Sequence, residues 1–142
     1  MTLENLLEVL LERVAVDKSS VLRLLDAANR SLNDAKLAKM SSEGRFDMAY
    51  KSIMQVANAA LQANGYRALT SRPGHHQTMI QSLPKTIGLA PTRMILLDKM
   101  RKQRNVCDYS GDLVGERFSW EAVDVAEELL RDMHQWLQHS LP

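Results

Sequence analysis

The chain has 142 residues, of which 45% are hydrophobic and 25% are charged, and its formal net charge is +1. These values are typical of globular domains and exclude a disordered chain, while the longest aliphatic run, Ile95 to Leu97, is too short to span a membrane. The one cysteine, Cys107, excludes an intrachain disulfide and a complete cysteine–histidine zinc site, so we expect no metal, no cofactor and a reducing, cytoplasmic location.

Apolar residues recur at helical spacing along most of the chain, and no segment shows the apolar–polar alternation of a strand. A first amphipathic helix is expected behind Thr2, ending near Asp17. Ser19 or Ser20 then caps a second helix that ends near Met40. The sequence therefore predicts two helices in its first 40 residues.

A long third helix is expected from Ser42 to about Asn64, where the Asn64–Gly65 pair supplies a left-handed C-cap. The segment from Arg67 to Gly74 has no periodicity and is predicted to be a loop. A shorter helix follows from about His75 to Leu83, and Pro84 begins another break.

A fifth helix begins at Pro91, which suits the first turn, and runs to about Tyr109. Ser119 is expected to cap the last helix, which has the cleanest apolar stripe in the chain. Five or six helices with short links predict an all-α, antiparallel bundle that forms a single domain over residues 1–142.

Basic residues are concentrated in one part of the chain. From Tyr66 to Arg104 there are eight basic residues and one acidic residue, Asp98, so this segment carries +7 and the rest of the chain −6. A local excess of this kind attracts a polyanion even when the whole protein is nearly neutral. The alternative is a solvated face that acidic neighbours balance, either in the fold or in a second subunit.

Five polar residues of the fifth helix share one broad face when successive residues are turned by about 100°. They are Arg101, Arg104, Asn105, Asp108 and Tyr109. This face could form a binding site. In the alternative interpretation, Arg104 and Asp108 form an i,i+4 pair and Tyr109 caps the helix end, so that the face only stabilises the helix.

The run from Arg101 to Tyr109 resembles the signature of HEPN (higher eukaryotes and prokaryotes nucleotide-binding) domains, in which an arginine and a polar residue precede a histidine. Phe46 to Tyr50, Ala60 to Tyr66 and the Gly74-His75-His76 run are also similar to that family. The resemblance covers residues 34–137, and residues 1–17 are expected to be an N-terminal helical elaboration of a HEPN-like domain.

The resemblance implies a small helical bundle that forms a homodimer, with the motif helices of the two protomers lining a basic cleft. Many HEPN domains are metal-independent endoribonucleases of toxin–antitoxin or stress-defence systems, paired with an antitoxin or a nucleotidyltransferase. Others bind RNA or a nucleotide without catalysis. In the catalytic members the ribose 2′-hydroxyl attacks the adjacent phosphate, an arginine stabilises the transition state and a histidine moves the proton.

Carried over residue by residue, the resemblance implies that Arg104 binds the phosphate and that Asn105 occupies the polar second position of the motif. Tyr109 then stands where the family has its histidine. Tyrosine is protonated at neutral pH and is a poor general base, so we expect binding rather than catalysis. Arg101, Lys102, His75 and His76 are expected to add to RNA or phosphate binding.

His75 and His76 are an alternative source of the missing imidazole, provided that the loop after Pro73 reaches the cleft. The commoner pattern for adjacent histidines on a helix is one packed and one exposed ring, since their side chains point about 100° apart.

Three functions remain open at this stage. The first is an RNA-binding or nucleotide-binding dimer, with metal-independent ribonuclease activity as its catalytic form. The second is a non-catalytic module whose basic face docks an acidic protein partner, such as an antitoxin or another subunit. The third is a structural bundle whose polar face is buried in a symmetric dimer.

Overall fold

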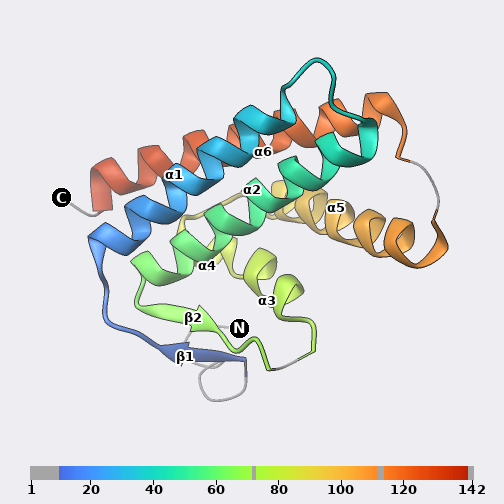
Figure 1. Cartoon of the computed structure of the whole chain (residues 1–142). Helices are drawn as coiled ribbons and strands as arrows, with labels where there is room; N and C mark the ends of the chain where they lie inside the picture. The colour runs from blue at the N-terminus through green and yellow to red at the C-terminus, as the bar shows by residue number, and fades with distance from the viewer. Residues whose placement is uncertain (1–9, 72, 112–113, 141–142) are drawn as a thin grey trace.

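The computed structural model describes residues 10–71, 73–111 and 114–140, which are mostly helical (Figure 1). The elements in chain order are β1 (Leu11–Arg13), α1 (Lys18–Ala35), α2 (Ser42–Ala63), β2 (Tyr66–Ala68), α3 (His75–Gln81), α4 (Leu83–Thr86), α5 (Pro91–Ser110) and α6 (Glu116–Ser140). The predicted helical character is confirmed, whereas the expected absence of strands is wrong. No helix in these described ranges has the length and hydropathy that a membrane span requires.

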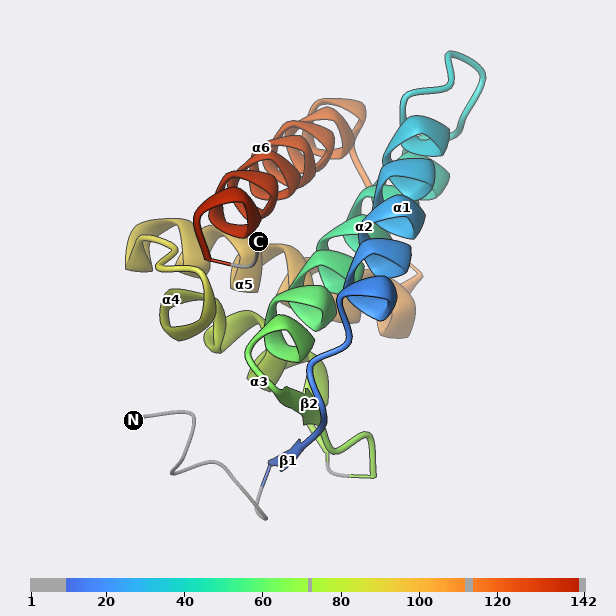
Figure 2. The same ribbon diagram turned by 90° about the vertical axis from the view of Figure 1, so that its left-hand side faces the viewer.

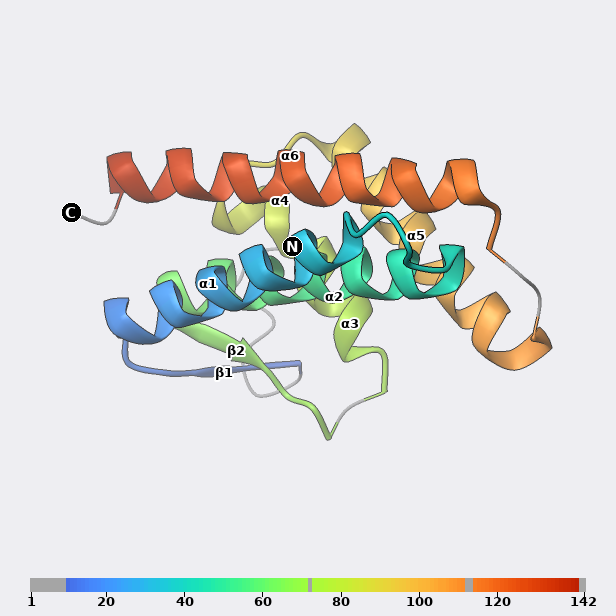
Figure 3. The ribbon, with the colours of Figure 1, turned by 45° about the horizontal axis from the view of Figure 1, so that its top comes forward.

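The central element is α2, which packs against every other helix (Figures 1 and 2). α1 and α6 lie along it as long helices, and α1 runs antiparallel to both α2 and α6 (Figure 3). The side chains of Ala49, Ala57 and Ala60 on α2 are fully buried, and small side chains at these positions let neighbouring helices approach closely. α3, α4 and α5 contact α2 from another side and bring the basic segment against it.

The N-terminal prediction is only partly testable, because residues 1–9 lie outside the described ranges. Residues Leu11 to Arg13 were expected to be helical, but they form the strand β1. This strand pairs antiparallel with β2 in the register Leu11↔Ala68 and Arg13↔Tyr66. Leu11 is fully buried there, in the main hydrophobic cluster. β2 lies at the start of the segment that was predicted to be a loop. The prediction was wrong because it used only the helical spacing of apolar residues near Leu11. That local pattern does not show a strand partner more than 50 residues away.

Both ends of α1 differ from the prediction. Asp17 is its N-cap in place of Ser19 or Ser20, and its carboxylate accepts a hydrogen bond from the Ser19 amide at 3.1 Å. The helix ends at Ala35 and not near Met40. The reason lies in Arg45 at the start of α2, which is only 2% exposed and donates hydrogen bonds to the carbonyls of Ala35 (3.0 Å) and Leu37 (2.8 Å).

The predicted bounds of the longer helices hold with two corrections. α2 ends as expected before Gly65, whose φ of 86° is the left-handed conformation that favours glycine. Pro84 does not break the chain but lies in the first turn of α4. Ser119 is not an N-cap: α6 begins at Glu116, and the fully buried Ser119 hydroxyl donates to the Glu116 carbonyl within the helix.

Candidate functional site

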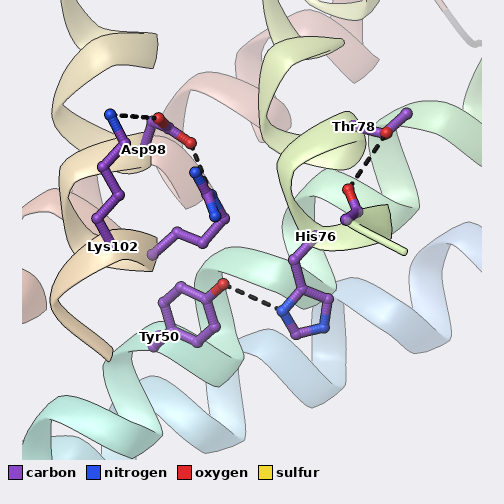
Figure 4. A network of polar contacts seen from close by, with 7 residues as sticks. Tyr50, His76, Thr78, Asp98 and Lys102 are labelled. Atoms are coloured by element: carbon purple, nitrogen blue, oxygen red, sulfur yellow. Dashed lines mark hydrogen bonds and ion pairs between the residues drawn. The ribbon is translucent and has the colours of Figure 1, made fainter. Parts of the chain in front are cut away.

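Three helices bring together a tyrosine, a histidine and an arginine. The Tyr50 hydroxyl of α2 lies 3.1 Å from Nδ1 of His76 on α3 (Figure 4). The guanidinium carbon of Arg104, on α5, lies 5.0 Å from the centroid of the Tyr50 ring, a cation–π contact. Tyr50 is only 3% exposed, so the hydroxyl is presented to His76 from the edge of the core.

The start of α3 places His76 beside Tyr50. Gly74 has a φ of 77°, and its carbonyl accepts hydrogen bonds from the Thr78 amide (3.1 Å) and hydroxyl (3.3 Å) (Figure 4). Further along α3, the residues from Thr78 to Ile80 are buried. His75 and His76 are both half-buried and their ring centroids are 4.6 Å apart, so the expectation of one packed and one exposed ring is wrong.

The environment keeps the tyrosine and the imidazole uncharged near neutral pH. Burial raises the pKa of Tyr50 to about 12, against the opposing effect of Arg104 and Arg101. Burial also lowers the pKa of His76, with smaller contributions in the same direction from His75 and the two arginines. The Tyr50 hydroxyl can donate a hydrogen bond to Nδ1 of a neutral His76, which then carries its hydrogen on Nε2, or accept one from Nδ1–H, which leaves Nε2 free as a base.

Asp98 offsets part of the positive charge on α5. Arg101 Nε donates to one carboxylate oxygen at 2.7 Å, and Lys102 Nζ lies 3.5 Å from the other (Figure 4). The hydrogen bond from Arg101 is the main reason why the pKa of Asp98 lies below its usual value. Elsewhere in the basic segment, Arg93 pairs with Asp132, so acidic neighbours in the fold do balance some of these residues.

Two hollows have His76 in their lining. The larger, of about 420 Å³, lies along α2 and is lined by Tyr50, Met54 and Arg104 as well as His76. The smaller, of about 190 Å³, is lined by His75, Gln77, Arg101 and Asn105 in addition to Gly74 and His76. The imidazole is therefore the side chain that both hollows share.

The structure thus gathers five of the residues that the sequence singled out. They are His75, His76, Arg101, Arg104 and Asn105. Lys102 is exposed and lines a different hollow with Lys99, so it is not brought to His76. The side chains of Asp108 and Tyr109 lie outside the described part of the structure, and the roles predicted for them stay predictions.

Sequence reasoning missed the part that Tyr50 plays. The residue belongs to the Phe46–Tyr50 run of the resemblance, and no role was predicted for its hydroxyl. Its partner His76 is 26 residues away, and no local pattern brings the two together. The one signal was the hydroxyl itself, on a side chain in an otherwise apolar stripe.

Among the described residues, no group of three or more histidine, cysteine, aspartate or glutamate side chains is arranged to hold a metal ion. Comparison with protein-family models, with curated protein sequences and with solved structures finds no match to this chain. The functional conclusion therefore rests on the site's own geometry.

Proposed function

We propose that this protein is a HEPN-like helical protein that binds RNA or a nucleotide by its phosphate, in the cleft between α2, α3 and α5. The observation that carries the proposal is the contact between the His76 imidazole and the Tyr50 hydroxyl, in hollows that Arg104 and Arg101 also line. Guanidinium groups match the geometry of phosphate oxygens, and a neutral imidazole donates a further hydrogen bond through Nε2.

The two hollows suit a chain of phosphates better than an isolated anion. Arg104 lines the larger hollow, and Arg101 and Asn105 line the smaller one. Since His76 lines both, a phosphodiester chain that occupies the two hollows passes the imidazole. The site therefore supports the binding of RNA as well as of a single nucleotide.

Metal-independent RNA cleavage is the second candidate, favoured by the contact between His76 and Tyr50. A hydroxyl both donates and accepts, so Tyr50 supports either tautomer of His76. In the tautomer whose Nδ1–H donates to the Tyr50 oxygen, Nε2 is unprotonated and takes the proton of the 2′-hydroxyl as the 2′-oxygen attacks phosphorus. The bond to the 5′-oxygen then breaks, that oxygen receives a proton from solvent water, and the His76 imidazolium returns its proton to the solvent. Arg104 stabilises the charge on the phosphoryl oxygens. The products are a 2′,3′-cyclic phosphate and a 5′-hydroxyl.

The binding proposal is tested with a fluorescent RNA oligonucleotide in EDTA, by anisotropy for affinity and by end-group analysis for products. We expect Arg104→Ala to weaken binding about 10-fold to 100-fold, the worth of a charged hydrogen bond to phosphate. Arg117→Ala on α6 is the matched control, since that side chain is 96% exposed away from the cleft. Equal affinities for the wild type and Arg104→Ala contradict the assignment.

A pair of substitutions decides which residue supplies the imidazole. If His76 moves the proton, His76→Asn abolishes cleavage and Tyr109→Phe leaves it unchanged. If Tyr109 stands in the functional place of the histidine, Tyr109→Phe abolishes activity, Tyr109→His increases it and His76→Asn has little effect. RNA that stays intact with the wild type supports binding without catalysis.

The partners expected from the resemblance stay predictions. They are a second copy of this chain and an antitoxin or a nucleotidyltransferase. Salt-sensitive binding to an acidic protein without binding to RNA supports the alternative of a protein-interaction module.

A further inference from the structure

The larger hollow extends beyond His76 along α2. Tyr50, Met54 and Asn58 follow one another at i,i+4 spacing and line it from the same face of the helix. Gln55 adds an amide from α2, and Met79 of α3 adds a second thioether. We call the part formed by Met54, Gln55, Asn58 and Met79 the methionine arm of the cleft.

Both amides of the methionine arm are oriented by neighbouring side chains. The Ser31 hydroxyl of α1, only 5% exposed as a residue, donates to Oε1 of Gln55 at 2.9 Å. The Gln62 side chain donates to Oδ1 of Asn58 at 3.1 Å. Within the described residues, neither the Gln55 nor the Asn58 amide nitrogen donates a hydrogen bond. Each amide oxygen thus already accepts a hydrogen bond inside the protein, while each amide N–H group is left to donate to a ligand.

The arm is one to two helical turns from the phosphate site. At a rise of about 1.5 Å per residue, Gln55 is about 7.5 Å and Asn58 about 12 Å along α2 from Tyr50. A nucleotide with its phosphate at Arg104 and His76 therefore extends its base toward the arm. The thioethers of Met54 and Met79 are polarizable and suit the faces of an aromatic ring. The hollow's volume of about 420 Å³ is within the range of small-molecule sites.

We infer that the methionine arm binds a nucleobase and favours guanine or uracil over adenine or cytosine. This inference rests on the proposed phosphate-binding function and names the ligand of the same cleft. Guanine and uracil present carbonyl oxygens that accept from the Gln55 and Asn58 amides. Adenine and cytosine present an exocyclic amino group at the corresponding position, which would face N–H donors without an acceptor.

The experiment measures the affinities of four nucleoside monophosphates and of ribose 5-phosphate by calorimetry. Gln55→Glu and Asn58→Asp each replace the amide nitrogen by oxygen and keep the oxygen that accepts from Ser31 or Gln62. We expect the wild type to bind GMP and UMP about 10-fold more tightly than AMP and CMP, the worth of one hydrogen bond. Each variant should reverse this ratio, because its carboxylate accepts from an exocyclic amino group.

The ratio between bases is the readout, because the added negative charge weakens the binding of every phosphate. Gln138→Glu on α6 adds the same charge outside this cleft and should leave the ratio unchanged. Equal affinities for all four nucleotides overturn the base site. In that case, binding of ribose 5-phosphate that Arg104→Ala abolishes still supports the phosphate site. No binding of ribose 5-phosphate or of any nucleotide overturns the proposed function and the base site together.

Discussion

At Tyr50 a single oxygen atom adds a hydrogen bond to His76 to what is otherwise ordinary aromatic packing. The ring packs beside Phe46, with centroids 6.3 Å apart, and beneath the guanidinium of Arg104. A phenylalanine would keep both of these contacts. It would leave Nδ1 of His76 without the hydroxyl that orients the imidazole, and a histidine acts through one ring nitrogen only when the other is held. The fold therefore brings the Tyr50 hydroxyl to His76, beside the basic face that the sequence predicted.

His76 should make the stability of the protein depend on pH. Burial lowers its pKa, so between this lowered value and about pH 6.5 the unfolded chain binds more protons than the folded protein. The free energy of unfolding should therefore rise as pH increases through this window and fall as pH decreases. Urea unfolding from about pH 5 to about pH 7.5 measures this slope.

The matched variants for this experiment are His76→Asn and His134→Asn, since His134 is an exposed histidine of α6. We expect His76→Asn to reduce the pH dependence and His134→Asn to preserve it. The same slope in the wild type and in His76→Asn would show that this imidazole has the same pKa in both states.

Among the elements, the end of α1 depends on a residue of α2. Arg45 is 2% exposed, bonds two carbonyls at the end of α1 and lies 4.1 Å from the centroid of the Trp120 ring on α6. One side chain thus terminates the first long helix and joins all three long helices. A buried charge of this kind is stabilising only while its hydrogen bonds are made.

Arg45→Met should therefore destabilise the fold. The substitution keeps an unbranched side chain but leaves the carbonyls of Ala35 and Leu37 without their donors, at an expected cost of about 3 kcal/mol in the free energy of unfolding. Chemical denaturation measures the difference. Arg117→Met, at an exposed position of α6, should change stability by less than about 0.5 kcal/mol. Equal stabilities of the two variants would contradict the role of Arg45 as a cap.

At the scale of the whole molecule, α5 carries large apolar side chains that are exposed within the described part of the chain. Ile95 is 62% exposed and Val106 is 51% exposed. The two residues are eleven positions apart on one helix, which places them on the same side, about three turns from each other. The HEPN resemblance predicts a homodimer through this helix, and exposed apolar residues are consistent with such an interface.

Light scattering tests the predicted dimer. The wild type should have twice the mass of one chain, and Ile95→Glu should shift it toward the monomer, because a carboxylate is costly to bury in an interface. Leu22→Glu on α1 is the control, since Leu22 is also exposed, at 43%, and lies on another helix. A monomeric wild type, or a dimer that Ile95→Glu leaves intact, would contradict this prediction.

The sequence by itself determined the long helices and several members of the site. These helices have local signals that can be recognised in the sequence alone. The signals are the apolar periodicity of α2, α5 and α6, the proline at the start of α5 and Gly65 after α2. The charge pattern identified the basic segment, and the polar face of the fifth helix together with the resemblance singled out Arg104 within it. These features depend on neighbours within a few turns of the same helix, so no tertiary information was needed to find them.

Only the tertiary structure decided how distant segments meet. It placed β1 against β2, ended α1 at Ala35, where Arg45 of α2 bonds the carbonyl, and joined Tyr50 to His76 across 26 residues. Each of these contacts depends on the packing of α2 against other elements. Burial at that packing surface also sets the pKa of Tyr50 and of His76. Spacing along the chain carries no measure of burial, and the chemistry of this cleft is therefore a property of the folded protein.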